Sequence, residues 1–257
     1  MITSITNQKI KNLIKLCQKS AERRAQNVFL VEGEKMFLET PRDQLKQVYI
    51  SESYYNRKKH ELNLAELTFE VISDKVFKAV SDTVTPQGIL CVVQQFYYTL
   101  EHLLDDSCPC FLILEDIRDP GNLGTILRSA EGAGVTGVIL SRGCVDIYNP
   151  KTIRSTMGSI YRVPFLYTDN LLEIVEEMKK RQIQVLAAHL QDSTDYDKLS
   201  YKNGTAFLIG NEGNGLSPAV SQSATKYIKI PMQGKVESLN AAVAASLLVY
   251  EVYRQRR

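Results

Sequence analysis

The sequence predicts an α/β protein whose C-terminal part is a mostly parallel sheet with helices on both faces. Short apolar runs such as FLIL (111–114) and GVIL (137–140) indicate strands that are buried on both sides. They alternate with amphipathic stretches such as LLEIVEEMKKR (171–181), which indicate helices. Because each helix carries the chain back across the sheet, successive strands run in the same direction.

A loss of periodicity between Tyr98 and Pro109 divides the chain into two parts. The 257 residues, of which 44% are hydrophobic, are enough for two cores. We therefore expect an N-terminal domain over 1–98, a linker over 99–109 and a C-terminal domain over 110–257.

The N-terminal part has the pattern of a small α/β domain. Apolar residues on one stripe predict a helix over 7–17, and two further helices are expected at 34–40 and 73–82. β-Branched and apolar runs predict strands at 28–31, 48–51, 69–73 and 88–96. Between residues 9 and 24 one acid stands against a basic cluster of Lys9, Lys11, Lys15, Lys19, Arg23 and Arg24. Such a cluster can meet phosphates, although charge alone favours an ordinary solvated helix face.

The C-terminal part alternates more regularly. Strands are expected at 111–117, 137–140, 161–167, 183–190, 205–210 and 225–230. The helices between and after them are expected to reach Ala133, to cover 149–157 and 171–181, and to run from Glu237 to Gln255.

Several classes of protein are disfavoured by composition. The five cysteines form no CxxC pair and the three histidines are scattered, so no metal site is predicted. There is no secretory signal and no run of 18 apolar residues, so we expect a reduced, cytoplasmic protein outside membranes.

Three segments rich in glycine, asparagine or proline each follow a predicted strand: 115–134, 209–217 and 230–246. In an open parallel sheet such loops gather at the carboxyl edge, where ligands bind. The segments contain neither the GxxxxGK[ST] pattern of a phosphate-binding loop nor the GxGxxG pattern of a dinucleotide fold, which argues against a nicotinamide dehydrogenase. Glycines that allow close backbone approach, with Glu212 among them, suit an adenosine with a positive charge better than a triphosphate. S-adenosylmethionine fits this description.

The motif trio NLGTILRSAEGAG (122–134), IGNEGNGLS (209–217) and IPMQGKVESLNAAVAASLLVYE (230–251) resembles the SpoU/TrmH family of RNA 2′-O-ribose methyltransferases. The upstream stretch RRAQNVFLVEGEKMFLET (23–40) is similar to the small N-terminal domain of that family. The resemblance implies a trefoil knot in the C-terminal domain, a homodimer formed through that domain, and an N-terminal domain that binds RNA. The RNA would be a tRNA or an rRNA.

The resemblance also implies site residues. S-adenosylmethionine would be held in the knot by Leu208, Gly210, Asn211, Glu212, Ile230, Met232, Ser238, Leu239 and Asn240. The catalytic residues would be Asn122, Arg128, Glu212 and Asn240. The residues that contact RNA would be Arg23, Arg24, Arg128, Arg154 and Ser155.

Arg128 could act either as the base that deprotonates the ribose hydroxyl or as a clamp for the RNA phosphate. An arginine with a pKa of about 12.5–13.8 is a poor base at neutral pH. We therefore expect it to clamp the phosphate beside the target ribose and to stabilise the developing alkoxide. Two alternatives stay open at this point: methylation of an RNA base, and a non-catalytic RNA-binding protein that keeps the fold.

Overall fold

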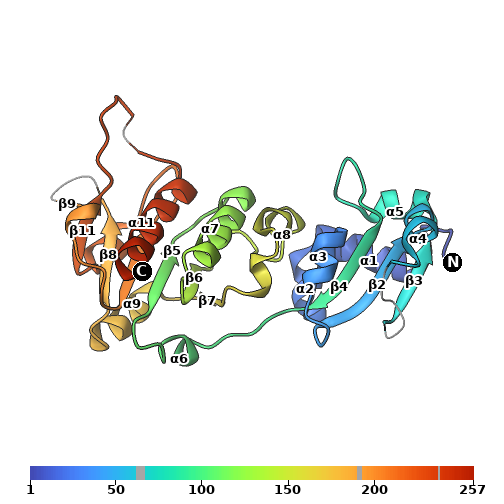
Figure 1. Ribbon diagram of the computed structural model, residues 1–257, viewed down its shortest axis with the longest axis horizontal. Coiled ribbons are helices and arrows are strands. Elements are labelled where there is room, and N and C mark those ends of the chain that lie inside the picture. The colour runs from blue at the N-terminus through green and yellow to red at the C-terminus, as the bar shows by residue number, and fades with distance from the viewer. Residues whose placement is uncertain (62–66, 190–192, 237) are drawn as a thin grey trace. The chain divides into compact units, whose positions relative to one another are not determined.

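A computed structural model describes residues 1–257 except 62–66, 190–192 and 237 (Figure 1). Contacts within the chain divide it into two compact units. The first unit contains residues 1–96 and 146–161, and the second contains residues 97–145 and 162–257. The stretch 146–161, which the sequence prediction assigns to the second domain, therefore clusters with the first unit.

The first unit is built on a four-stranded sheet of order β1-β4-β2-β3. Its strands are β1 (Val28–Glu32), β2 (Leu45–Ser51), β3 (Phe69–Ile72) and β4 (Ile89–Gln94). β4 runs antiparallel to both of its neighbours, and β2 and β3 are parallel. All four strands lie within two residues of the predicted ranges, apart from an earlier start of β2, because their apolar runs form the centre of the core.

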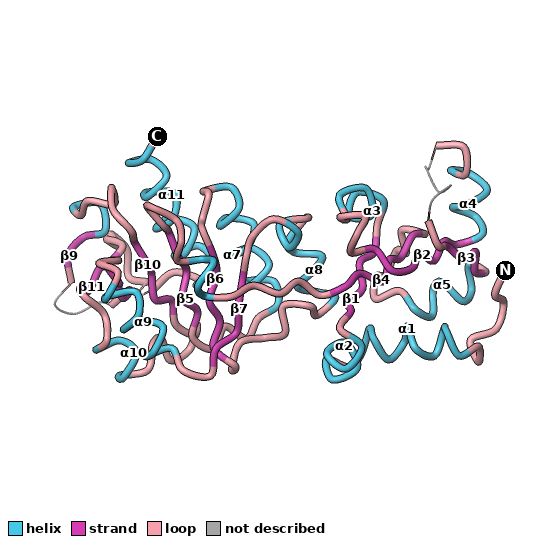
Figure 2. Tube along the Cα trace, turned by 90° about the horizontal axis from the view of Figure 1, so that it is seen from below, coloured by secondary structure: helices cyan, strands magenta, loops and turns pink. Residues whose placement is uncertain are grey.

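Helices cover both faces of this sheet (Figure 2). One face packs against α1 (Gln8–Gln18) and α5 (Asp74–Val80), whose buried residues join those of the strands in one cluster. The other face carries α3 (Glu34–Glu39) and α4 (Glu52–Lys58). The unit is completed by α2 (Ser20–Gln26), α8 (Pro150–Thr156) and the 3-10 helix η1 (Ser159–Tyr161).

The second unit contains a seven-stranded sheet of order β7-β6-β5-β10-β8-β11-β9 in the described residues, and every pairing in it is parallel. Its strands are β5 (Cys110–Leu114), β6 (Gly137–Ser141), β7 (Phe165–Thr168), β8 (Gln184–Ala188), β9 (Thr194–Asp195), β10 (Thr205–Ile209) and β11 (Lys226–Lys229). The central strands β5 and β10 are buried at every residue, as continuous apolar runs require. The predicted parallel sheet is confirmed.

The helices of the second unit lie on the two faces of this sheet (Figure 2). α7 (Pro120–Gly132) and α11 (Ala241–Arg256) pack on each other and cover one face. α9 (Leu171–Lys180) and α10 (Pro218–Gln222) cover the other, while α6 (Leu100–Leu103) and the 3-10 helix η2 (Tyr196–Lys198) are short connections. No helix in the described part of the chain is long and apolar enough to cross a bilayer.

Some predicted boundaries differ from the observed ones. The strand expected from Tyr161 begins only at Phe165, because Tyr161 closes η1 and Pro164 has no N–H to donate to a ladder. The last helix begins at Ala241, where the side chain of Asn240 accepts hydrogen bonds from the N–H groups of Ala242 and Val243. Two predicted boundary residues, Leu190 and Glu237, lie outside the described residues.

Candidate active site

A cleft of about 580 Å³ opens at the carboxyl ends of β8, β10 and β11 in the second unit. Two of the three predicted loops form most of its wall, the loop after β10 and the loop after β11. The lining residues are Ala188, His189, Ile209–Leu216, Ile228–Ile230, Met232, Ser238, Leu239, Ala241 and Ala244. The arrangement matches the expectation that ligands bind at this edge of a parallel sheet.

The loop of residues 210–217 is a tight turn held by its own backbone. The N–H of Asn211 donates to the carbonyl of Gly215 at 3.1 Å, and the N–H of Gly215 donates back at 2.9 Å. A Cβ on Gly210 would overlap with backbone atoms of Gly215 and Leu216. Glycine is therefore required at this position for space, which lets the backbone form one wall of the cleft.

A chain of polar side chains joins the three loops at the edge of the cleft. The amide of Asn240 donates to the side-chain oxygen of Asn122 at 3.0 Å. The amide of Asn122 in turn donates to the carboxylate of Glu212. Three of the four predicted catalytic residues are therefore in direct contact, one from each motif.

Helix α7 positions Asn122 through its N-terminus. Asp119 caps the helix by accepting the N–H of Asn122 at 2.8 Å, and Pro120 occupies the first turn, where its missing N–H costs nothing. Arg128 lies on the same helix, about 9 Å further along its axis at 1.5 Å per residue. Its side chain is exposed and it does not line the cleft. The structure therefore separates Arg128 from the other three predicted catalytic residues.

The predicted cofactor residues fall into two groups. Those that line the cleft are Gly210, Asn211, Glu212, Ile230, Met232, Ser238 and Leu239. Leu208 does not line the cleft, because it is fully buried in β10 between β5 and β8, and its contact with the cofactor stays a prediction. Asn240 does not line the cleft either, and its side-chain amide donates to Asn122.

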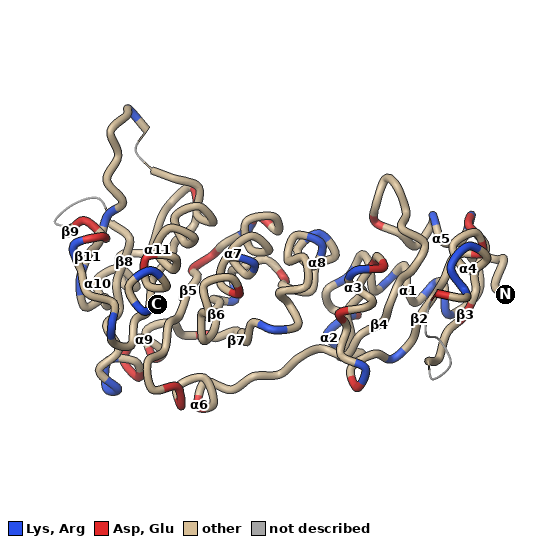
Figure 3. The backbone as a smooth tube through the Cα atoms, viewed as in Figure 1, with Lys and Arg blue, Asp and Glu red and all other residues tan. Residues whose placement is uncertain are grey.

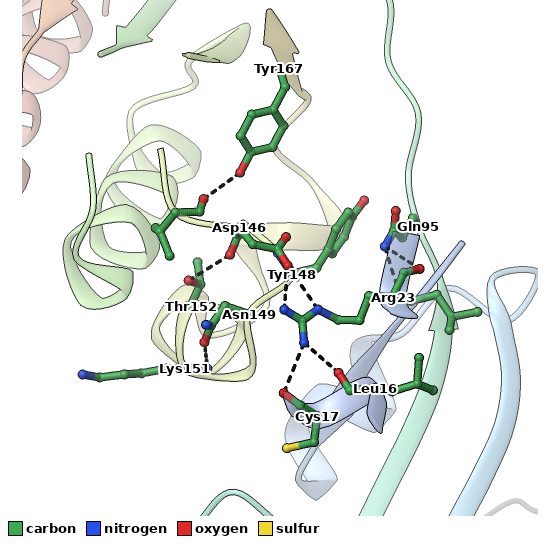
Figure 4. Close-up of polar contacts among 12 residues, drawn as sticks. Leu16, Cys17, Arg23, Gln95, Asp146, Tyr148, Asn149, Lys151, Thr152 and Tyr167 are labelled. Carbon is green, nitrogen blue, oxygen red and sulfur yellow. Dashed lines mark hydrogen bonds and ion pairs between the residues drawn. The ribbon is translucent and has the colours of Figure 1, made fainter. Parts of the chain in front are cut away.

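Arg23 is a correction to the predicted RNA-binding residues. It is only 2% exposed and lies in the interior of the first unit. Its guanidinium donates to Asp146 at 2.6 and 3.1 Å and to the carbonyls of Leu16 and Cys17 at 2.7 and 3.1 Å (Figure 4). A guanidinium that is buried and makes these four bonds is not accessible to a phosphate, so the predicted contact of Arg23 with RNA is wrong.

The other predicted RNA-contacting residues of the first unit lie near its surface. Arg24 is exposed at the end of α2. Arg154 and Ser155 belong to α8, which Figure 3 marks as a basic stretch. Arg154 forms an ion pair with Asp82 at 2.8 Å and keeps 35% of its side chain exposed. An incoming phosphate would therefore compete with Asp82 for this arginine.

Sequence reasoning missed several residues of the site. His189 and Lys229 line the cleft from the ends of β8 and β11. Glu115 and Asp116, directly after β5, form hydrogen bonds with the loop after β10. Their signal was available, since each follows a strand at the carboxyl edge, but no pattern in the sequence indicated their partners.

The chemistry of the cleft fits S-adenosylmethionine. Its wall combines apolar side chains such as Ile230 and Met232 with exposed backbone around Gly210, which suits a flat adenine. Glu212 places a carboxylate where a sulfonium or ammonium charge is favoured. No cluster of three potential metal ligands occurs among the residues the structure describes.

Models of two known families match the two parts of the chain. The model of the SpoU rRNA Methylase family matches residues 109–250, and that of the MRM3-like substrate binding domain matches residues 7–91. The chain is 33% identical over 256 residues to the 23S rRNA (guanosine(2553)-2′-O)-methyltransferase RlmP of Bacillus subtilis (strain 168), with 98% of each chain covered.

Solved structures agree with these matches. An AdoMet-bound rRNA methyltransferase from Sinorhizobium meliloti is 28% identical with a TM-score of 0.83, covering 98% of this chain and 97% of that one. A crystal structure of an RNA 2′-O ribose methyltransferase is 31% identical with a TM-score of 0.85, covering 99% of this chain and 98% of that one.

Proposed function

Because the chain belongs to the SpoU rRNA methylase family, we propose that it methylates the 2′-hydroxyl of a ribose in RNA with S-adenosylmethionine. In this reaction the sulfonium S–CH₃ bond breaks, an O–CH₃ bond forms, and the proton of the hydroxyl leaves. S-adenosylmethionine supplies the methyl group as an electrophile. The observation that carries the proposal is the cleft at the carboxyl edge, with Glu212, Asn122 and Asn240 bonded together beside it.

These three residues have complementary tasks in the proposed site. Asn240 fixes the carbonyl of Asn122, so the amide of Asn122 is turned toward Glu212. Glu212 is thereby held at the cleft wall, where its charge favours a cationic ligand. The three motifs thus act as one unit.

Arg128 is proposed to clamp the RNA phosphate next to the target ribose. It is exposed on α7, and the structure gives it no ion-pair or hydrogen-bond partner among the described residues that would compete for its charge. Its planar guanidinium can donate two parallel bonds to a phosphate, and it stabilises negative charge as the hydroxyl loses its proton.

Replacing Arg128 with lysine tests this clamp. Lysine keeps the charge but loses the bidentate geometry. We expect the single-turnover rate of Arg128→Lys to fall roughly tenfold to thirtyfold, the loss of about one charge-assisted bond. Affinity for S-adenosylmethionine, measured by calorimetry, should stay unchanged. A rate near that of the unmodified protein would count against the clamp.

The function itself is tested with purified protein, labelled S-adenosylmethionine and total RNA. After digestion to nucleosides, mass spectrometry should find the added methyl on the ribose fragment. A methyl on the base fragment would establish base methylation instead. If calorimetry detects no binding of S-adenosylmethionine, the protein is a non-catalytic RNA-binding module.

The substrate is proposed to be tRNA or rRNA. The relative from Bacillus subtilis is named for a guanosine of 23S rRNA, which favours rRNA. The first unit, matched by a substrate-binding domain model, would hold the RNA through Arg24, Arg154 and Ser155. We also propose a cytoplasmic location. The N-terminal domain is proposed to end at residue 98 and the C-terminal domain to begin at residue 110. The trefoil knot stays a prediction.

We also infer that two copies associate through the second unit. Helix α11 exposes Val243, Leu247, Tyr250 and Tyr253, each at least 38% accessible. The first three recur at i, i+4 and i+7 and form one apolar stripe. A second copy of the chain would cover this stripe.

Leu247→Glu would place a charge in the middle of that stripe and should convert the dimer to a monomer. Light scattering coupled to size exclusion measures the mass. Leu38→Glu is the control, because Leu38 is an exposed leucine of the first unit. A wild-type monomer, or a Leu247→Glu variant that keeps the mass of a dimer, would contradict the inference.

A further inference from the structure

Glu115 makes contact with both ends of the loop 210–217 although it belongs to a different strand connection. Its backbone N–H donates to the carbonyl of Ile209 at 2.9 Å, which extends the pairing of β5 with β10 by one residue. Its carboxylate accepts both the N–H and the hydroxyl of Ser217, each at 2.7 Å. One residue thus contacts both the residue that precedes the loop and the last residue of the loop.

Asp116 holds the same loop near its beginning. Its backbone carbonyl accepts the side-chain amide of Asn211 at 2.8 Å. Asp116 has a φ of 56°, a left-handed conformation that is uncommon outside glycine. The hydroxyl of Ser141 donates to its carboxylate at 2.9 Å, and its own N–H donates to the same hydroxyl at 3.0 Å. These bonds maintain the strained backbone that directs its carbonyl to Asn211.

The side chain of Asn211 makes three hydrogen bonds. While its amide donates to Asp116, its oxygen accepts the N–H groups of Gly213 at 2.9 Å and Asn214 at 3.3 Å. Asn211 therefore shapes the loop. Besides the paired backbone bonds of Asn211 and Gly215, the residues after β5 hold the loop in place.

We propose that Glu115 and Asp116 form a clamp that preorganises the cofactor loop, with Glu115 as its principal positioning residue. The inference rests on the proposed function, since the loop 210–217 lines the proposed cofactor cleft. A loop of eight residues with three glycines has many conformations when free, and ordering it at the moment of binding would weaken affinity. The clamp orders it beforehand. It also holds Glu212, inside the loop, in reach of Asn122.

The carboxylate of Glu115 suits this task better than an amide. Two oxygens accept two donors of Ser217 at once. Glutamine offers one neutral acceptor for the N–H of Ser217, and its NH₂ group can only reverse the second bond by donating to the hydroxyl oxygen. Glu115→Gln therefore keeps the size of the side chain but removes the charge that strengthens both bonds.

Calorimetry with S-adenosylmethionine is the first test. We expect the Kd of Glu115→Gln to rise roughly tenfold, because two charge-assisted hydrogen bonds become weaker neutral ones. The KM for S-adenosylmethionine should rise in parallel, whereas kcat at saturating cofactor stays within about twofold. Glu173→Gln is the matched control, because its carboxylate accepts a side-chain hydrogen bond from Asn170 on α9. Its Kd should equal that of the wild type.

Hydrogen exchange without cofactor gives a readout independent of activity. Amides of residues 210–217 should exchange faster in Glu115→Gln, while those of β5 and β10 keep wild-type protection. Combining Glu115→Gln with Ser217→Ala should raise the Kd by less than the product of the two single increases, because both substitutions act on the bond between Glu115 and the Ser217 hydroxyl. Ser217→Thr keeps the hydroxyl and should bind as the wild type does.

Two outcomes would overturn the clamp while leaving the proposed function intact. One is a wild-type Kd in Glu115→Gln, and the other is faster exchange throughout the second unit, which would make Glu115 a general stabiliser. Failure of the wild-type protein to bind S-adenosylmethionine would instead refute the proposed function.

Discussion

Replacing Arg23 with methionine is expected to lower the free energy of unfolding of the first unit by about 3 kcal/mol. Methionine matches the length of the aliphatic stem but leaves Asp146 without its partner. Breaking a buried ion pair by removing one member typically costs about 3–5 kcal/mol. Asp146 keeps 23% of its side chain exposed, so water compensates in part and the lower end applies.

Arg23 also completes the end of a helix. The carbonyls of Leu16 and Cys17 lie in the last turn of α1, where no N–H of the helix can reach them. The guanidinium donates to both while its other nitrogens bind Asp146 (Figure 4). Arg23→Lys should recover only a small part of the stability, because a single ammonium cannot serve partners on two sides.

Hydrogen exchange monitored by mass spectrometry localises the effect. Peptides of α1 and of residues 146–161 should lose protection together in Arg23→Met, since Arg23 joins these segments. Peptides of β5 and β6 in the second unit should not change. Arg24→Met is the matched control: Arg24 is the exposed neighbour, and its replacement should alter stability by less than about 0.5 kcal/mol while weakening RNA binding. Equal loss of protection in both variants would contradict this assignment.

The contrast between Arg23 and Arg24 shows where sequence reasoning fails. Both belong to one basic cluster, and charge along the chain cannot tell which member turns inward. The partner of Arg23 lies 123 residues away in the sequence, in the stretch 146–161 that packs with the first unit. The pattern of residues along the sequence does not reveal that contact.

The parallel sheet could be predicted because its cause is local. The run of β5 is apolar at every position and that of β10 at every position after Thr205, and burial on both faces accounts for such runs. Short elements were missed for the opposite reason. Helix α10 has five residues, beginning with Pro218, which are too few to display a period, and β9 has only two.

The loops that form the site could be predicted from the sequence, but the hydrogen bonds between them could not. Loops that follow parallel strands were expected to meet, and two of the three line the cleft. The direct contact of Asn122 with Glu212 and Asn240, and that of Glu115 with Ser217, depend on strand order, which periodicity does not reveal.

Gly210→Ala is expected to reduce affinity for S-adenosylmethionine roughly 100-fold, or about 3 kcal/mol. The added Cβ would overlap with the carbonyl of Gly215 and the nitrogen of Leu216. These are backbone atoms, and the paired hydrogen bonds between Asn211 and Gly215 hold them in place. A flexible side chain could move aside, but here the whole loop must shift, and the cleft wall shifts with it.

Substitutions at two other glycines distinguish the possible causes of this loss of affinity. A Cβ on Gly234, in the loop after β11, meets nothing within 4 Å, so Gly234→Ala should bind the cofactor within about twofold of wild type. A Cβ on Gly215 also meets open space, but its φ of 68° is unfavourable for alanine. Gly215→Ala should therefore cost about 1 kcal/mol, roughly fivefold in Kd.

The order of the Kd values of the three variants distinguishes the causes, because each variant isolates one physical effect in the two loops that line the cleft. If crowding at Gly210 dominates, Kd rises from Gly234→Ala through Gly215→Ala to Gly210→Ala, as calorimetry can measure. RNA binding by the first unit, followed by gel shift, should be the same in all three. If the Gly210→Ala protein binds the cofactor as tightly as the Gly234→Ala protein does, the loop must adopt another path when the cofactor is bound. The close approach at Gly210 would then have no part in recognition.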